Sequence, residues 1–481
     1  MNQQMKTFKK AYLAGLIALT AASCELTEVT NPYVTEDRFL NTPQAAITWL
    51  NGVRRQASTT VGTVVEFTEL VSDNYFNNYT QSSKVFDIPQ INHYDVDVTR
   101  IQSAIHKLME MSEFGLTEVL SADAESTPLQ RAELLLYKAY AQLLGADLYV
   151  GLPTEPLGPV KTPAELLTGA IALLTEAQDI FQDPDDKRIC ALLMGRAYHR
   201  LGDATQAVTR AQEALANPLL LRQVKYGTQT GPSNNFQSAI FSSNTNSFAP
   251  LPRLDFLDPK YFHTTAVVFE DEKPIAIAKA EEAYLIIAEA QIAANQLTQA
   301  RQTLHSLLTE TVAARPVVMI DDSRETRNGG NRDDYPLTEV QVRFDADDQP
   351  RSGYVLDRQQ GNIPAYTVSG TRVTGEDINA AADADGLLYL VYRLRQELFI
   401  AEGRRMTDLG IRFPVSQQEE LSNANVGSAH TQPVLPAFIP GDRAMDDFTH
   451  DTATGTVTMR YDMNKVLIEN KTDETIIPFI N

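Results

Sequence analysis

The chain has 481 residues, of which 43% are hydrophobic and 21% are charged, a balance that supports a packed core and excludes wholesale disorder. Its formal net charge is −21, so nucleic acid and an anionic membrane surface are poor partners for it. This length fits one large domain or two or three ordinary ones.

The N-terminus has the order of a bacterial lipoprotein signal. Lys6, Lys9 and Lys10 precede a short apolar run, and small residues lead directly to Cys24. The run is too short to span a bilayer, which favours a cleaved signal peptide over 1–23. The order Ala-Ala-Ser-Cys resembles a lipobox, so we expect Cys24 to be lipid-modified and to anchor the chain in outer-membrane lipid. An ordinary signal followed by a chance cysteine is the alternative.

Cys190 is the one other cysteine of the sequence. If Cys24 carries lipid, no intramolecular disulfide can form. The apolar helical context "RICALLMGRAYHRLGD" predicts that Cys190 is an inert core residue. The sequence has no further apolar run of 18 or more residues, so we expect the chain to be anchored to a membrane and not to span it.

Helices are predicted to alternate with loops in the first third of the chain. Residues 24–45 are polar and are expected to form an extended N-terminal segment. Apolar residues at three- and four-residue spacings then predict three helices, over 43–71, 98–120 and 127–148. The segment 72–95 between the first two is rich in Asn, Ser and aromatic residues, which predicts a loop.

Two segments 93 residues apart share the small-residue spacing of tetratricopeptide-like helix pairs. Gly195, Gly202 and Ala207 of the segment 191–215 correspond to Ala288, Asn295 and Ala300 of the segment 282–307. Small residues at these positions allow two antiparallel helices to pack closely. A third segment, 163–180, matches only the second helix of such a pair. We therefore predict a helical scaffold and not a regular solenoid.

Long polar segments interrupt this scaffold. Residues 221–276 and 313–378 are rich in Gly, Asn and Asp and lack helical periodicity. Loops of this length inside a compact domain are usually functional or locally disordered. We expect these two segments and 72–95 to be inserted in a single, mainly α-helical domain over 46–481 that contains little β-structure. Its last part, 427–481, is expected to include a short hairpin.

The stretch "LRQELFIAEGRRMTDLGIRFPVSQQEELSN" is predicted to begin as one heavily charged helix. Helical spacing would form three ion pairs, Arg393–Glu397, Arg404–Asp408 and Glu402–Arg405. A solvated charged face is the simple interpretation, since exposed pairs contribute little stability. Arg405, however, shares an apolar stripe with Leu398 and Leu409, where an unpaired charge would cost several kcal/mol. We therefore expect Arg405 to have a buried carboxylate partner.

These residues resemble the C-terminal signature of the SusD/RagB family of outer-membrane nutrient-binding lipoproteins. Glu402, Gly403, Arg405 and Asp408 stand at positions of the family's signature helix. The lipobox, the run "ELVSDNY" and the tetratricopeptide-like pairs occur in the same order as in the family. The sequence departs from it in having no tryptophan after this helix and in continuing about 55 residues past Val426.

The resemblance implies a mainly α-helical fold in which tetratricopeptide-like helix pairs form a scaffold with long inserted loops. It also implies that the signature helix fixes the fold beneath the ligand surface and performs no chemistry. The implied function is to bind an oligosaccharide at the cell surface and deliver it to a SusC-like TonB-dependent transporter. An oligopeptide ligand, as in the RagB branch, stays open. A tetratricopeptide-like adaptor for another protein is the alternative from a different class.

Motifs for catalysis are absent from the sequence. It contains no G-x-S-x-G, no P-loop, no G-x-G-x-x-G after a strand and no H-E-x-x-H. The seven histidines are scattered, and the "AADADG" run (381–386) lacks carboxylates at the first and twelfth positions of a calcium loop. We expect no catalytic residue, metal or cofactor. An exported hydrolase with an unrecognised carboxylate pair remains the weakest alternative.

Sugar binding would use aromatic faces together with amide and carboxylate groups. The loops supply this combination in Asp73, Asn74, Tyr75, Asn78, Tyr79 and Phe236, which we predict as ligand-binding residues. The family resemblance supports these loops by region only. The alternative is that the aromatic residues pack onto the scaffold. The lone Trp49 lies in a predicted core helix, so a broad stacking platform is not expected.

Overall fold

The computed structural model describes residues 36–78, 86–227, 231–240, 247–262, 272–323, 325, 330, 332–441 and 444–480. The predicted signal peptide, Cys24 and Tyr79 lie outside these residues. No helix within the described ranges is both long and apolar enough to cross a membrane.

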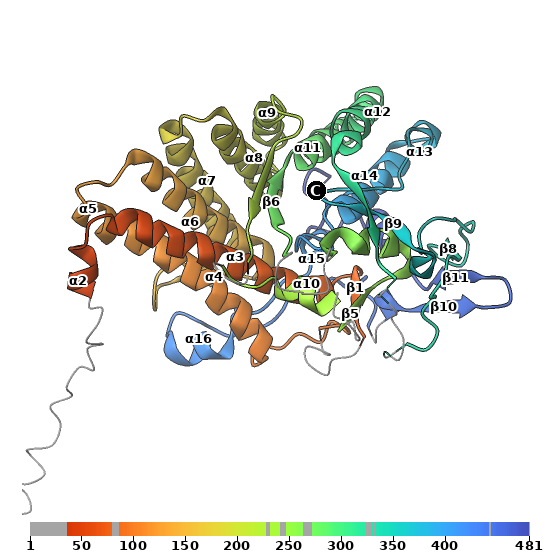
Figure 1. Cartoon of the computed structure of the whole chain (residues 1–481), viewed down its shortest axis with the longest axis horizontal. Helices are drawn as coiled ribbons and strands as arrows, with labels where there is room; N and C mark the ends of the chain where they lie inside the picture. The colour runs from red at the N-terminus through yellow and green to blue at the C-terminus, as the bar shows by residue number, and fades with distance from the viewer. Residues whose placement is uncertain are drawn as a thin grey trace, which may run out of the picture.

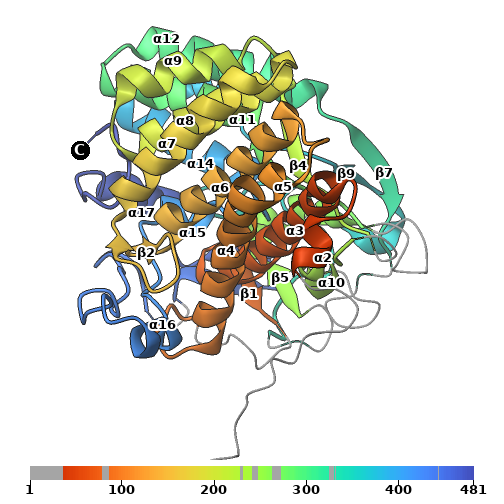
Figure 2. The same ribbon diagram turned by 90° about the vertical axis from the view of Figure 1, so that its left-hand side faces the viewer.

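The long helices pack against one another in chain order and form a curved layer (Figure 1). Figure 2 shows α7, α6, α4 and α3 side by side across one face of the molecule. The helices are α2 Glu36–Leu40, α3 Ala45–Val71, α4 Val96–Phe114, α5 Leu120–Ala122, α6 Pro128–Leu148, α7 Pro163–Ile180, α8 Pro184–Arg200, α9 Ala204–Ala214, α10 Asn235–Ile240, α11 Ala280–Ala293, α12 Leu297–Ser306, α13 Gly375–Ala380, α14 Ala384–Leu398, α15 Arg405–Asp408, α16 Gln417–Ser422 and α17 Met463–Glu469. The structure thus confirms the predicted mainly α-helical fold.

Local sequence signals fix where these helices begin. Thr127 and Thr162 each form a capping box with the residue three positions later, and a proline occupies the first turn of α6 and of α7. Asp95 caps α4 by accepting a hydrogen bond from the backbone N–H of Asp97 at 2.8 Å. These caps satisfy backbone donors that a helix start leaves free.

The two predicted tetratricopeptide-like pairs are present as α8–α9 and α11–α12, and α9 packs against α11. Gly195 lies so close to α9 that a Cβ atom there would stand 3.4 Å from the carbonyl oxygen of Ala207. Gly202 and Asn295 occupy the equivalent turns and both have positive φ, 75° and 56°. This match confirms the residue correspondence. The segment 163–180 is α7, and it pairs with α6 as the second helix of a hairpin.

The predicted loops contain more strand than expected. The strands are β1 Tyr75–Asn77, β2 Leu152–Pro153, β3 Val160–Lys161, β4 Leu221–Val224, β5 Phe248–Pro250, β6 Ile275–Lys279, β7 Val317–Asp321, β8 Gln341–Arg343, β9 Asn362–Tyr366, β10 Phe448–Asp451 and β11 Thr456–Met459. All have five or fewer residues, too few for alternation to be recognised.

The short strands pair across long sequence distances and tie the insertions to the helices. β1 pairs with β5, β4 with β6 and β7 with β9, all antiparallel. The predicted C-terminal hairpin is β10–β11, and β11 also pairs in parallel with β8. The β1–β5 and β8–β11 pairings join different predicted loops, whereas β4–β6 and β7–β9 join the two ends of one predicted loop. A 3₁₀ helix over Pro252–Tyr261 adds further order to the second insertion.

The single charged helix predicted near the C-terminus is wrong, because α14 ends at Leu398 and α15 begins at Arg405. The turn between them has positive φ at Ala401, 59°, and at Gly403, 71°. The Arg393–Glu397 pair forms as predicted, with Nε 2.8 Å from Oε1. The predicted Glu402–Arg405 pair does not form, since helical spacing stops at the turn. The predicted Arg404–Asp408 pair does not form because Arg404 pairs with Glu282 and Asp408 pairs with Arg395.

Candidate binding site

The sequence-predicted ligand residues lie inside the protein. Asp73, Asn74, Tyr75, Asn78 and Phe236 are each at most 2% exposed. The two predicted loops do meet, through the β1–β5 pairing, and the Tyr75 ring contacts Phe236 edge to face with centroids 5.2 Å apart. Burial keeps these side chains from touching a ligand in this structure. Their contacts in this structure are structural, and their role as ligand-binding residues, like that of Tyr79, stays a prediction.

Arg405 has the buried carboxylate partner that the sequence required. Its Nε lies 2.5 Å from Oδ1 of Asp73 and its Nη2 lies 3.0 Å from Oδ2, and both side chains are almost fully buried. Asn464 accepts a further hydrogen bond from Nη1 at 2.9 Å. Asp408 is paired with Arg395, with Nη2 2.7 Å from Oδ1. The signature positions Arg405 and Asp408 thus join distant segments in the core.

Glu402 is the shared partner of two buried lysines. Its Oε1 lies 2.7 Å from Nζ of Lys279 and 2.5 Å from Nζ of Lys260. Lys279 also donates to the carbonyl oxygen of Leu398 at 2.6 Å and to the hydroxyl of Ser369 at 2.9 Å. Burial lowers the pKa of Lys279 to about 8, although the Glu402 carboxylate acts in the opposite direction. Both contacts of Glu402 are made with buried side chains, so its role in this structure is structural.

Glu69 links the same turn to α3. The backbone N–H of Gly403 donates to its Oε1 at 2.9 Å, and Asn74 Nδ2 donates to its Oε2 at 2.8 Å. Gly403 is required here by its positive φ and by its contacts, since a Cβ would lie 3.2 Å from Thr68 Oγ1 and from Val64 Cγ1. The signature glycine thus allows the turn to approach α3.

The ionisation of Glu69 should make stability depend on pH. Burial raises its pKa to about 7, against the hydrogen bonds from Asn74 and Gly403. The folded state therefore keeps this proton to a higher pH than the unfolded chain does. The free energy of unfolding should fall as pH rises from about 4.5 to about 7, by about 3 kcal/mol. Urea titrations across this range should show a flatter profile for Glu69→Gln, and an unchanged profile in that variant would contradict the assignment.

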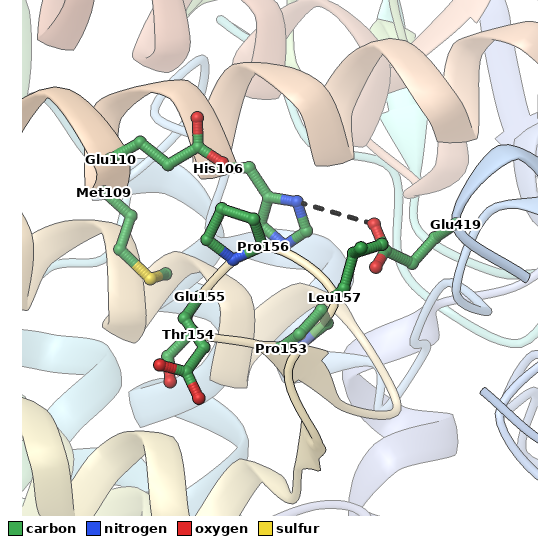
Figure 3. Close-up of a pocket in the computed structure, with 9 residues that line it drawn as sticks. All are labelled: His106, Met109, Glu110, Pro153, Thr154, Glu155, Pro156, Leu157 and Glu419. Atoms are coloured by element: carbon green, nitrogen blue, oxygen red, sulfur yellow. Dashed lines mark ion pairs between the residues drawn. The ribbon is translucent and has the colours of Figure 1, made fainter. Parts of the chain in front are cut away.

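Three of the surface hollows that described residues line could receive a ligand. The hollow in Figure 3 has a volume of about 160 Å³ and lies between α4, the loop 153–157 and α16. His106 and Glu419 face each other across it, with Nδ1 4.0 Å from Oε2. Apart from Thr154, its other lining residues are apolar or acidic. Because small-molecule sites usually have a volume of ~300–1,000 Å³, this hollow is too small for an oligosaccharide.

A second hollow, of about 390 Å³, lies beside α17 and is lined mainly by carboxylates. Most of its charged side chains already have partners. Asp345 binds Lys465 at 3.0 Å, Asp348 binds Arg351 at 3.1 Å, and Asp462 accepts a hydrogen bond from Tyr389 at 2.7 Å. A ligand would have to displace these contacts. Within the described ranges, no group of three or more His, Cys, Asp or Glu is arranged to hold a metal ion.

The third hollow is a polar groove between α3 and α4, and we name it the α3–α4 groove. Its volume is about 330 Å³, within the range of ligand sites. α3 contributes Gln56, Thr59, Gly62 and Thr63, α4 contributes Arg100, Ser103, Ala104 and Lys107, and the segment that leads into α10 contributes Pro232, Ser233 and Asn235. On each long helix the polar side chains stand three and seven residues apart, which places them on one face.

Several polar groups of the α3–α4 groove are free to bind a ligand. Ser103, Lys107 and Asn235 are exposed, and Thr63 forms part of the floor at 7% exposure. Among the described contacts, the side chains of these four residues make no hydrogen bond. Gly62 gives room to Tyr226, whose hydroxyl donates to the carbonyl oxygen of Ser58 at 2.9 Å. The groove therefore offers hydroxyl, amide and ammonium groups at one open surface.

Comparison with known proteins was made through sequence and through structure. No family model matches the chain, and no curated protein matches its sequence. A SusD superfamily protein from Bacteroides vulgatus ATCC 8482 superimposes with a TM-score of 0.54 at 12% identity, covering 81% of this chain and 98% of its own. The protein has the SusD fold. A SusD superfamily protein from Bacteroides thetaiotaomicron VPI-5482 matches with a TM-score of 0.51 at 12% identity, covering 81% and 98% of the two chains.

A third structure with the SusD fold is a protein from Bacteroides vulgatus ATCC 8482 proposed to bind sugar. It matches with a TM-score of 0.51 at 13% identity, covering 80% of this chain and 98% of its own. These matches confirm at the level of the fold the resemblance that the signature residues indicated. The α3–α4 groove was not among the sites predicted from the sequence. A signal that could have found it is the polar face that each of the two predicted helices carries.

Proposed function

We propose that this SusD-fold protein is a non-catalytic, surface-exposed outer-membrane lipoprotein that binds an oligosaccharide and delivers it to a SusC-like TonB-dependent transporter. The observation that carries the proposal is an open, polar groove of about 330 Å³ on a SusD fold. A protein proposed to bind sugar has a similar structure over 80% of this chain. Sugars present many hydroxyl groups, and the groove presents matching donors and acceptors.

A binding role fits the chemistry of the groove better than a hydrolytic one. Glycoside hydrolysis generally requires two carboxyl groups on either side of the scissile bond. Among the described residues that line the groove there is no Asp or Glu. Thr63, Ser103 and Asn235 can orient sugar hydroxyls but cannot supply acid and base catalysis.

The anchor and the partner are proposed from the sequence. The lipobox-like order before Cys24 supports lipid modification, and the SusD fold supports partnership with a transporter by family resemblance. In this proposal residues 24–45 connect the lipid to a single domain over 46–481. Tyr79 remains a proposed ligand contact from its loop.

The alternative of a tetratricopeptide-like adaptor is less well supported. Such adaptors bind a peptide on an open face of their stacked helix pairs. Here α8 and α11 pack against β6, and α11 also packs against α14. Other segments of the same chain thus cover part of the surface to which a peptide would bind. An oligopeptide in the α3–α4 groove remains an outcome that a binding screen would detect.

Ser103→Trp should weaken oligosaccharide binding by the soluble chain beginning at Glu25. The new ring would fill the groove from an exposed helix position, so the fold should tolerate it. Calorimetry against a panel of oligosaccharides and peptides should give saturable binding of one glycan class, with unchanged products afterwards. In the variant, affinity should fall by at least about tenfold, or about 1.4 kcal/mol.

Thr209→Trp is the matched control, since Thr209 is also exposed on a helix, α9, at a distance from α4 (Figure 1). This variant should bind as the parent does. Equal binding by both variants would move the site away from the groove. Cleavage of the glycan would favour a hydrolase, and peptide binding alone would favour the oligopeptide alternative.

A further inference from the structure

The two charged side chains that line the α3–α4 groove are both cationic. Arg100 and Lys107 lie on α4, two turns apart, which separates their backbone positions by about 10 Å along the helix. The whole chain carries a formal net charge of −21. The net negative charge of the protein repels an anionic ligand over most of its surface. The cationic groove is a local site where this repulsion is replaced by attraction.

Arg100 is placed to bind an anion. Its guanidinium carbon lies 5.2 Å from the centroid of the Phe67 ring, a contact that holds the planar group. Its one ion-pair partner among the described residues is Glu66, with Nη2 3.8 Å from Oε2, too long for a hydrogen bond. The Arg100 side chain remains 49% exposed. Several of its N–H groups are therefore available to a planar carboxylate or a sulfate ester.

Glu66 only partly compensates Arg100. Burial raises the pKa of Glu66, because its carboxyl group lies mostly beneath the surface. Its Oε2 accepts no hydrogen bond from the described residues. Lys107 is exposed and makes no ion pair within the described part of the chain. The groove thus keeps a positive balance toward solvent.

Among the residues that the structure describes, the groove lacks the aromatic side chain on which binding of neutral sugars usually depends. Its described lining residues include no aromatic side chain, so no ring face stacks on a sugar. Hydrogen bonds to neutral hydroxyls contribute modest net affinity because they replace bonds to water. Charge-assisted hydrogen bonds are about twice as strong as neutral ones. Arg100 and Lys107 therefore offer the strongest contacts that this groove can make.

We propose that the α3–α4 groove selects acidic oligosaccharides, with Arg100 binding a carboxylate or sulfate group on one sugar residue and Lys107 an anionic group on another. Thr63, Ser103 and Asn235 then bind the hydroxyls between them. This inference rests on the proposed glycan-binding function and specifies its substrate class. A uronic acid and a sulfated sugar share the chemistry that the two cations recognise.

The test compares glycans that differ only in charge. An oligogalacturonate is paired with its methyl ester, and a sulfated galactan oligosaccharide with its desulfated form, in calorimetry on the soluble chain. The acidic member of at least one pair should bind at least about tenfold more tightly, with affinity that decreases as salt increases. The pair that shows the difference identifies carboxylate or sulfate as the preferred group.

Arg100→Gln and Lys107→Gln should each reduce that preference, because each removes one of the two cations that bind an anionic group. Arg131→Gln is the matched control, because Arg131 is 44% exposed on α6 and pairs with Glu176 at 2.6 Å. Equal affinity for acidic and neutral members, or preference for a neutral glycan, would overturn the inference and leave the proposed function standing. A preference retained in both groove variants would also overturn it. Binding of no glycan at all would overturn the proposed function itself.

Discussion

Replacing Arg405 by methionine is expected to lower the free energy of unfolding by about 3–5 kcal/mol at neutral pH, because it leaves a buried carboxylate without its cation. Burial alone would raise the pKa of Asp73, and the guanidinium of Arg405 is what keeps that pKa below its usual value. Without Arg405, Gln396 is the one described residue that still donates a hydrogen bond to the carboxylate, at 2.9 Å from Oδ2. Urea denaturation measures the loss.

The pH dependence gives this prediction a specific signature. In the parent, the Asp73 contribution is lost as pH falls through the lowered folded pKa. In Arg405→Met the folded pKa of Asp73 should rise above its unfolded pKa. Stability should then decrease as pH rises from the unfolded pKa to the raised folded pKa. A variant that loses stability equally at all pH values would contradict this explanation.

Two further variants separate the buried charge from loss of packing. Arg131→Met removes an exposed arginine from its pair with Glu176 and should cost less than about 1 kcal/mol. Asp73→Asn combined with Arg405→Met removes both charges and should be more stable than Arg405→Met alone. If the double variant is no better than the single one, packing and not the unpaired charge accounts for the loss.

The need for a partner of Arg405 could be predicted from sequence because it depends only on a charge in an apolar stripe. The identity of Asp73 could not, since it lies 332 positions away. The break between α14 and α15 was also missed. Its cause is local, in the positive φ of Ala401 and Gly403, but alanine rarely adopts that conformation and gives no sequence signal for it.

The candidate site was harder to predict than the fold. Periodic apolar residues and the small residues of the helix pairs are local features, and they predicted α3, α6 and the two helix pairs correctly. Polar and aromatic residues in loop 72–95 were interpreted as ligand contacts, whereas β1 carries Tyr75 into the core. The α3–α4 groove depends on three segments that meet only in the folded chain, so no single stretch of sequence reveals it.

Glu402→Gln is expected to lower the free energy of unfolding by about 3–5 kcal/mol at neutral pH, since one carboxylate compensates two buried ammonium groups. Lys260 and Lys279 are 6% and 1% exposed, and water cannot replace Glu402 as their partner. An amide accepts a hydrogen bond but carries no charge. Glu176→Gln, at a side chain 45% exposed, is the matched control and should cost less than about 1 kcal/mol.

Raising the pH should partly restore the stability of Glu402→Gln. The folded pKa of Lys279 is already lowered to about 8 by burial, and loss of the nearby carboxylate should lower it further. An unfolded lysine titrates near pH ~10.4, so the unfolded state binds more protons in the interval between the two values and stability rises with pH there. The rise should begin at lower pH in the variant than in the parent, in urea titrations between about pH 7 and 10. A cost that does not change with pH would mean that Glu402 acts through its shape and hydrogen bonds, and that its charge is not what holds the turn between α14 and α15 to the core.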